Sequence, residues 1–272
     1  LHMSDSTTEK TELGNYFVAN YPPFSFWKPS FLPEAHKVLN AQPEPSTPLG
    51  LYAHIPFCRK RCKFCYFRVY TDKNAKDVDN YLDALIQEIA LCSQLPVRGG
   101  RDLDFVYFGG GTPSYLSVNQ LEKLFNGIKS SFTWNGAREV TFECEPGTLQ
   151  QHKLAALRQM GVTRLSLGVE NFNDEILESN GRAHHSAEIV KAYTWARELD
   201  FPLINIDLIA GMVGETTENW KDCIKKTIEI APDCITIYQM ELPFNTVFSK
   251  ELKQVDQPDP LAVSDWPTKR AW

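Results

Sequence analysis

Short apolar segments that predict β-strands alternate with amphipathic segments that predict helices, and the alternation occurs six times between residues 51 and 240. The strand segments are 51–57, 103–108, 139–143, 162–169, 202–209 and 233–240. The helical segments are 77–95, 117–132, 149–161, 173–180, 186–199 and 216–231. Strands with nearly continuous apolar sequence are typical of a parallel sheet that is covered on both faces. We therefore expect an α/β fold, either an open doubly wound sheet or a partial barrel, with ligands at the carboxyl ends of the strands.

The charge and composition exclude several classes of protein. The net charge is −6 and, apart from "RKRCK" at residues 59–63, the Lys and Arg residues are dispersed, so the basic face that nucleic acid requires is absent. No apolar run approaches the roughly 18 residues of a transmembrane helix, and the N-terminus lacks the pattern of a signal peptide. We therefore expect a cytoplasmic protein that neither spans a membrane nor binds nucleic acid.

Three regions are expected along the chain. Residues 1–50 are rich in Pro, Ser, Thr and aromatic residues without periodicity and predict an irregular arm across the body, with "LHM" at its start as a tag remnant. Residues 51–245 contain the strand–helix alternation. Residues 246–272 close with the pattern of a helix start, in which Asp265 is the N-cap and Pro267 lies in the first turn, so we expect the parent protein to continue.

Three cysteines, Cys58, Cys62 and Cys65, follow the first strand directly with the spacing C-x3-C-x2-C. Zinc sites usually combine paired C-x2-C knuckles or add a histidine, whereas closely spaced thiolates on one loop can hold three irons of a 4Fe–4S cluster. The fourth iron then stays open for another ligand. The remaining cysteines are read as small buried hydrophobic residues, namely Cys92, Cys144, Cys223 and Cys234.

The second strand ends in a glycine triplet within "YFGGGTPS", at Gly109, Gly110 and Gly111. Glycines allow a ligand to approach the backbone closely, and backbone amides can bind a small charged group. A tight strand-to-helix turn is the alternative explanation. The position of the triplet, one strand after the cysteine loop, favours a ligand site.

Taken in order, the cysteine loop, "FGGGTPS", "FECEPGT", "RLSLGVENF" and "NIDLIAG" resemble the motifs of radical S-adenosylmethionine (SAM) enzymes. The set is similar to the HemN-like family, typified by oxygen-independent coproporphyrinogen III oxidase, and covers about residues 50–245. The resemblance implies a partial (βα)6 barrel with an irregular N-terminal arm. It also implies a 4Fe–4S cluster and SAM as cofactors, with a second SAM in some relatives.

The resemblance also implies roles for individual residues. Cys58, Cys62 and Cys65 would ligate the cluster. The SAM contacts that it implies are Tyr52, Gly109, Gly110, Gly111, Thr112, Glu143, Glu170, Arg182 and Asp207. Glu143 would face the SAM amino group, Arg182 would hold its carboxylate and Asp207 would reach the ribose. His54 is read as a core histidine, and His184 and His185 as loop or cap residues.

Two positions depart from the pattern of the coproporphyrinogen oxidases. Phe67 stands where they have a further cysteine, and Glu170 stands where they typically have Gln. Both differences weaken the case for porphyrinogen decarboxylation, and the precedent of related enzymes favours radical C-methylation or cyclopropanation of an organic substrate. Oxidative decarboxylation or ring opening of a tetrapyrrole is one alternative, and a haem chaperone without substrate turnover is another. The resemblance further implies a flavodoxin- or ferredoxin-type electron donor.

Overall fold

A computed structural model describes residues 26–252 and 263–272. Its centre is one parallel sheet with the strand order β1-β2-β3-β4-β5-β6. The strands are β1 (Leu49–Ile55), β2 (Leu103–Gly110), β3 (Glu139–Cys144), β4 (Arg164–Glu170), β5 (Leu203–Ala210) and β6 (Cys234–Gln239). Because β1 and β6 are the two edges of this sheet, the curved sheet is an incomplete barrel.

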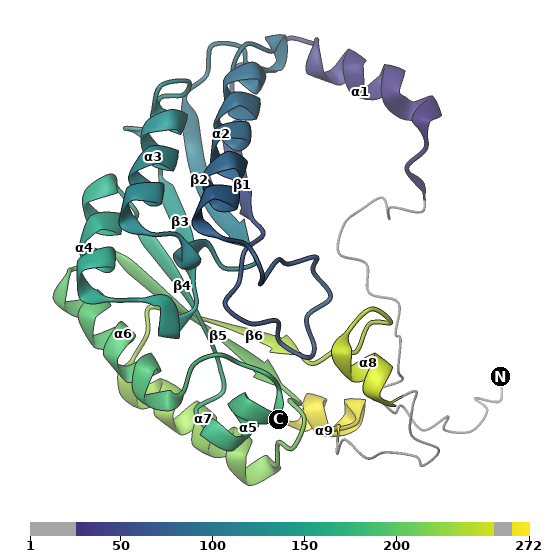
Figure 1. Cartoon of the computed structure of the whole chain (residues 1–272), viewed down its shortest axis with the longest axis vertical. Helices are drawn as coiled ribbons and strands as arrows, with labels where there is room; N and C mark the ends of the chain where they lie inside the picture. The colour runs from purple at the N-terminus through teal and green to yellow at the C-terminus, as the bar shows by residue number, and fades with distance from the viewer. Residues whose placement is uncertain (1–25, 253–262) are drawn as a thin grey trace.

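Helices cover only the outer, convex side of the sheet (Figure 1). The helices are α1 (Leu32–Leu39), α2 (Ala75–Cys92), α3 (Val118–Lys129), α4 (Gln151–Met160), α5 (Asp174–Ser179), α6 (Ser186–Glu198), α7 (Thr217–Ile230), α8 (Val247–Leu252) and α9 (Trp266–Ala271). Local sequence determines several ends, since Asn74 and Ser117 form capping boxes at α2 and α3. Gly161 ends α4 in the left-handed conformation (φ +101°), as its position in the sequence predicted.

The two faces of each strand differ in polarity. On β5, Ile204, Ile206 and Leu208 are fully buried against the helices, while Asn205 and Asp207 point to the inner face. This alternation follows from the two-residue period of a strand. The outer face supplies the core, and the inner face supplies polar groups to a cavity. The strands therefore have helices on one face only, and this arrangement is the partial barrel rather than the doubly wound sheet.

The N-terminal arm differs from the sequence prediction in part. Residues 32–39 form helix α1, whereas an irregular conformation was expected throughout the arm. Residues 26–42 are exposed, so this part of the arm does not lie across the body as expected. The helix is only two turns long, too short to give a clear helical period in the sequence, and Pro33 lies in its first turn, where proline is tolerated. Residues 1–25 lie outside the described residues.

At the other end of the chain, α9 begins as predicted, because the Asp265 side chain accepts a hydrogen bond from the Thr268 N–H and proline lies in the first turn. Helix α8 was not predicted from the sequence. It lies against the cysteine loop, where the Phe248 N–H donates to the Lys63 carbonyl oxygen at 3.1 Å. In the ranges 26–252 and 263–272, no helix has the length and apolar character needed to cross a bilayer.

Candidate functional site

The cysteine loop begins where β1 ends, because Pro56 interrupts the strand after Ile55. Two backbone hydrogen bonds close its base, from the Cys58 N–H to the Tyr70 carbonyl and from the Tyr70 N–H to the Pro56 carbonyl. The loop thus lies at the carboxyl ends of the strands, where ligands gather in folds of this type. Its three cysteines are free thiols that line one cavity.

That cavity has a volume of about 450 Å³, within the usual range of a small-molecule site. The residues predicted from the sequence that line it are Cys58, Cys62, Cys65, Gly110, Gly111, Thr112, Glu143, Glu170, Arg182 and Asp207. They come from the cysteine loop, from four different strands or their ends, and from the loop after α5. The fold therefore brings together residues that are far apart in the sequence.

Gly111 shows why the glycine loop tolerates no side chain. A Cβ atom at this position would lie 3.0 Å from the Cys58 Sγ and 3.0 Å from the Phe57 carbonyl oxygen. The neighbouring Thr112 hydroxyl donates to the Cys58 Sγ at 3.2 Å. Close approach of two backbones, rather than the turn alone, requires the glycine here.

Glu143 is held at both carboxylate oxygens. The Tyr107 hydroxyl donates to one oxygen at 2.7 Å, and the Gly110 N–H donates to the other at 3.1 Å. Burial raises the pKa of Glu143, although both hydrogen bonds act to lower it. Asp207 is held in a similar way on β5, since it accepts from the Ser166 hydroxyl at 2.8 Å and from the Asn205 amide at 2.9 Å. Both carboxylates are thus fixed before any ligand binds.

Glu170 and Arg182 form a buried pair, with Glu170 Oε1 lying 3.6 Å from Arg182 Nη2. Glu170 adopts φ +64°, a left-handed conformation that is unusual for a residue other than glycine and that accompanies an irregularity in the β4–β5 register. Arg182 also donates to the Gly168 carbonyl at 2.7 Å and to the Cys62 Sγ at 3.3 Å. Its Nε is buried without a hydrogen-bond partner among the described residues.

Two predicted contacts lie apart from the cavity lining. Tyr52 and Gly109 face the same inner side of the barrel but are not among the residues that line the cavity. The Tyr52 ring lies 5.9 Å from the Tyr107 ring, and its hydroxyl lies 2.9 Å from His54 Nδ1. His54 was read as a core histidine, but it is only half-buried and belongs to this inner polar face.

Several residues at the site were missed in the sequence. Tyr107, Ser166 and Asn205 hold the predicted carboxylates, and their signal was a polar residue at alternate positions of an apolar strand. His184 was read as a loop or cap residue but is buried, with 1% of its surface exposed. His185 precedes α6, where its N–H donates to Glu188, as expected for a cap position.

The cysteines outside the loop also need a correction. Cys144 and Cys223 are buried as predicted, but Cys92 is exposed and Cys234 is half-buried. Cys92 lies in the last turn of α2, where its side of the helix faces solvent and not the core. Apolar periodicity locates the buried face of a helix but does not show how far the core extends along it.

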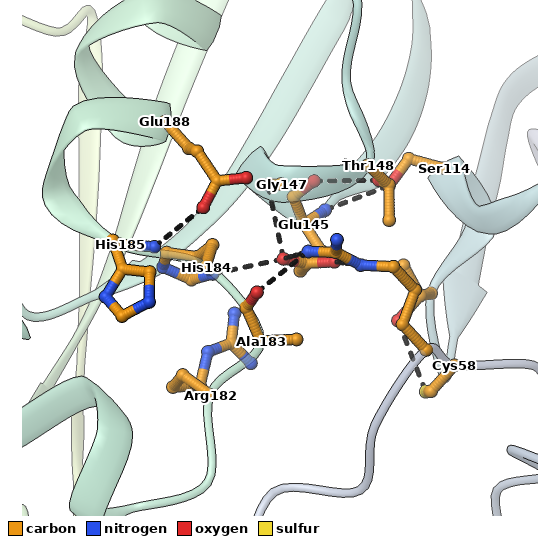
Figure 2. Close-up of polar contacts among 12 residues, drawn as sticks. Cys58, Ser114, Glu145, Gly147, Thr148, Arg182, Ala183, His184, His185 and Glu188 are labelled. Atoms are coloured by element: carbon orange, nitrogen blue, oxygen red, sulfur yellow. Dashed lines mark hydrogen bonds and ion pairs between the residues drawn. The ribbon is translucent and has the colours of Figure 1, made fainter.

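Glu145, directly after β3, lines the cavity and carries a buried polar network (Figure 2). It accepts two hydrogen bonds from the Arg59 guanidinium, at 2.8 Å and 3.1 Å. His184 Nδ1 lies 3.3 Å from the same carboxylate. Burial acts to raise the pKa of Glu145, but contacts with His184 and Arg59 and the charge on Arg182 outweigh it and lower the pKa to about 2.

The cysteine loop has the donor set that an iron–sulfur cluster requires. Three thiols open onto one cavity, and no histidine or carboxylate completes a closed four-ligand set on the loop. Burial raises the pKa of Cys65 to about 11, and metal coordination is what ionises such a thiol. Within residues 26–252 and 263–272, no three His, Cys, Asp or Glu side chains are grouped as around a single metal ion.

A family model described as the radical SAM superfamily matches residues 52–227, so this chain belongs to the radical SAM superfamily. Proteins of this superfamily use a 4Fe–4S cluster and SAM, and the arrangement of thiols, glycines and carboxylates described above fits these cofactors.

Within the superfamily, this chain is a relative of coproporphyrinogen oxidases and haem chaperones. It is 35% identical over 222 residues to oxygen-independent coproporphyrinogen III oxidase of Escherichia coli (strain K12), covering 81% of this chain and 48% of the relative. It is 35% identical over 198 residues to the heme chaperone HemW of Bacillus subtilis (strain 168), covering 72% of this chain and 52% of the relative. The chain thus spans about half the length of the curated relatives it matches.

A solved structure supports the same relationship. Coproporphyrinogen III oxidase (HemN) from Escherichia coli superimposes with a TM-score of 0.76 at 31% sequence identity, covering 90% of this chain and 54% of that chain. The methyltransferase TsrM from Kitasatospora setae matches with a TM-score of 0.52 at 15% identity, which shows the shared fold alone. The relatives described here at 30% identity or more therefore do not support radical methylation, which the sequence had favoured.

Proposed function

We propose that this chain binds a 4Fe–4S cluster through Cys58, Cys62 and Cys65 and binds SAM in the adjoining cavity. The observation that carries the proposal is that these thiols and the largely buried carboxylates of Glu143, Glu170 and Asp207 line one cavity of about 450 Å³. SAM carries a sulfonium and an ammonium group, and buried carboxylates favour a cationic ligand.

The residue roles follow from the chemistry of each group. Glu143, whose carboxylate is fixed by two donors, would accept from the SAM ammonium. Arg182 would hold the SAM carboxylate with its planar fork, and Asp207 would accept from the ribose hydroxyls. The loop from Gly109 to Thr112 would line the methionine part, with Tyr52 supporting it through Tyr107.

The cluster, when bound, supplies the electron that splits SAM and generates a 5′-deoxyadenosyl radical. The chain itself would orient SAM and keep water away from the reacting carbon. We propose that the cavity would hold an organic substrate that gives up a hydrogen atom to this radical and one electron to an external acceptor, an oxidation of the class named for the coproporphyrinogen oxidases. Their 31–35% identity supports this reaction above methyl transfer.

Haem binding without turnover is the second candidate, as in the relatives named heme chaperones. The observation that favours it is an aromatic pair at the cavity wall. Tyr66 and Phe67 have ring centroids 4.4 Å apart, and 43% of Phe67 is exposed. Such a surface suits a flat conjugated ligand, because stacked aromatic groups gain contact area without polar desolvation.

An external electron donor is part of the proposal. Residues 58–70 contain no acidic residue in a chain of net charge −6, and their cations are Arg59, Lys60, Arg61, Lys63 and Arg68. This local charge supports an acidic flavodoxin- or ferredoxin-type partner in the cytoplasm, since opposite charge accelerates association.

The deciding experiment is anaerobic product analysis of iron- and sulfide-reconstituted protein with SAM and a chemical reductant. The proposal expects 5′-deoxyadenosine from the wild type and none from Cys58→Ala, Cys62→Ala or Cys65→Ala, measured by mass spectrometry. Carbon dioxide from coproporphyrinogen III would identify the decarboxylation, and S-adenosylhomocysteine would restore methyl transfer. Stoichiometric haem binding with no 5′-deoxyadenosine above background would instead establish the chaperone.

A further inference from the structure

One buried carboxylate, that of Glu145, connects the cysteine loop to the loop that carries Arg182. On the cysteine side it binds Arg59, the residue after Cys58, through two hydrogen bonds to the guanidinium. Arg59 keeps 37% of its side-chain surface exposed and could be fully solvated, so this bidentate contact selects one of many conformations. The cysteine loop is thereby attached to the end of β3 at the residue next to Cys58.

The other side of the network fixes the two residues after Arg182. The Arg59 guanidinium donates to the Ala183 carbonyl at 3.0 Å. The His184 ring spans from Glu145, at 3.3 Å, to the Val169 carbonyl at 3.2 Å (Figure 2). Glu145 is therefore linked to the backbone on which the Arg182 side chain stands.

Arg182 in turn reaches back to the cysteines, since its Nη1 donates to the Cys62 Sγ at 3.3 Å. The contacts thus run from Arg59, next to Cys58, through Glu145 to the backbone that follows Arg182, and from the Arg182 side chain to Cys62. A displacement at Glu145 would move a cluster thiol and the arginine together, because the contacts form one connected network.

We infer that Glu145 is a positioning residue that sets the distance between the cluster and the SAM carboxylate by holding Arg59 and the Arg182 loop. This inference rests on the proposed function. It adds to that function a residue at the cavity wall whose carboxylate is already bound by Arg59 and lies beside His184, and which would therefore act through Arg59 and Arg182. A second prediction follows, namely that Arg59 and Glu145 act as one unit, so their substitutions are not additive.

The test compares Glu145→Gln, Arg59→Gln and the double variant with the wild type, using cluster-loaded full chain. Glu229→Gln is the matched control, because Glu229 is an exposed carboxylate on α7 that pairs with Lys225 outside this network. The readouts are SAM affinity by equilibrium dialysis, the change in the electron paramagnetic resonance spectrum of the reduced cluster on adding SAM, and the melting temperature.

We expect Glu145→Gln and Arg59→Gln each to weaken SAM binding about tenfold and to reduce the SAM-induced spectral change, with the double variant no worse than either. Glu145→Asp should recover part of the loss, because it keeps the charge. Wild-type affinity in Glu145→Gln, or an equal loss in Glu229→Gln, would overturn the inference. If Glu145→Gln does not fold, Arg59→Gln decides alone, since the Arg59 side chain is partly exposed and His184 remains beside the Glu145 carboxylate. A wild type that shows no SAM-dependent change would overturn the proposed function and this inference with it, whereas a failure confined to the variants would leave that function standing.

Discussion

Tyr107 and Glu143 lie on neighbouring strands, and the Tyr107 hydroxyl donates a 2.7 Å hydrogen bond to the Glu143 carboxylate. The Gly110 N–H donates to the other oxygen of this carboxylate at 3.1 Å. One carboxylate therefore attaches the glycine loop to β3 and is oriented by a side chain of β2. Glu143 was recognised in the sequence, but the tyrosine that orients it was not.

Replacing Tyr107 with Phe removes this hydrogen bond while keeping the ring. Because hydrogen bonds to charged groups contribute about 1.5–3 kcal/mol, we expect SAM binding to weaken roughly tenfold. The melting temperature should change little, since the Tyr107 side chain faces the cavity side of the sheet and not the core. Equilibrium dialysis with labelled SAM measures the effect, and Tyr193→Phe serves as a control tyrosine that bonds outside the site. Unchanged affinity would mean that Gly110 alone orients Glu143.

Glu170 predicts a dependence of stability on pH. Burial raises its pKa to about 7 despite the nearby Arg182, while Asp207 and Glu143 act in the same direction as burial. Since the folded pKa lies above the unfolded one, the carboxyl favours folding at low pH, and this contribution is lost as pH rises through about 7. Glu215, whose pKa burial also raises to about 7, adds to the same slope.

Glu170→Gln should therefore flatten, but not abolish, the fall in melting temperature between pH 5 and 8, because burial also raises the pKa values of Glu215, Glu143 and Asp207. The measurement is thermal unfolding of the cluster-free chain across this pH range under reducing conditions. Glu229→Gln is the control, because Glu229 is exposed on α7 and pairs only with Lys225. An identical slope in Glu170→Gln and wild type would show that Glu170 does not titrate in this range.

Gly111→Ala tests the close approach between the glycine loop and Cys58. The added methyl group would lie 3.0 Å from the Cys58 Sγ and would displace it. We expect reconstituted iron to fall well below the roughly four irons of an intact cluster. Gly136→Ala is the control, since nothing lies within 4 Å of a Cβ there. Equal iron content in both variants would exclude a steric role for Gly111.

Phe248→Ala tests whether α8 stabilises the cysteine loop. Phe248 is 1% exposed and packs in a small apolar cluster with Phe64 and Met240. Truncating such a side chain lowers the free energy of unfolding by about 3–5 kcal/mol. We expect the loss to destabilise the cysteine loop, because Phe248 packs against Phe64 of that loop. We expect faster release of iron to a chelator, followed by absorbance, than in wild type. Phe244→Ala, which changes a side chain that is 59% exposed, should release iron at the wild-type rate, and equal rates in both variants would contradict the prediction.

Much of this protein was determined by local sequence. Short apolar segments and helical periodicity located the strands and most helices, and the spacing of Cys58, Cys62 and Cys65 indicated an iron–sulfur site. Glu143 and Asp207 stood out in the sequence because burying a carboxylate in an apolar strand is unfavourable unless it is paired or hydrogen-bonded. Signals of this kind depend on neighbours in the sequence and need no knowledge of the fold.

The tertiary structure alone decided the rest. It curved the sheet so that helices cover one face, and it brought Glu145 to Arg59 across 86 positions of the chain. It also buried His184, which the sequence placed in an ordinary loop. Such contacts arise because the strand ends converge at one edge of the sheet. No local sequence pattern predicts them, because Glu, Arg and His residues are solvated at most positions of a protein. The cysteine and glycine motifs are therefore readable in short stretches of sequence, whereas the contact between Glu145 and Arg59 exists only in the folded chain.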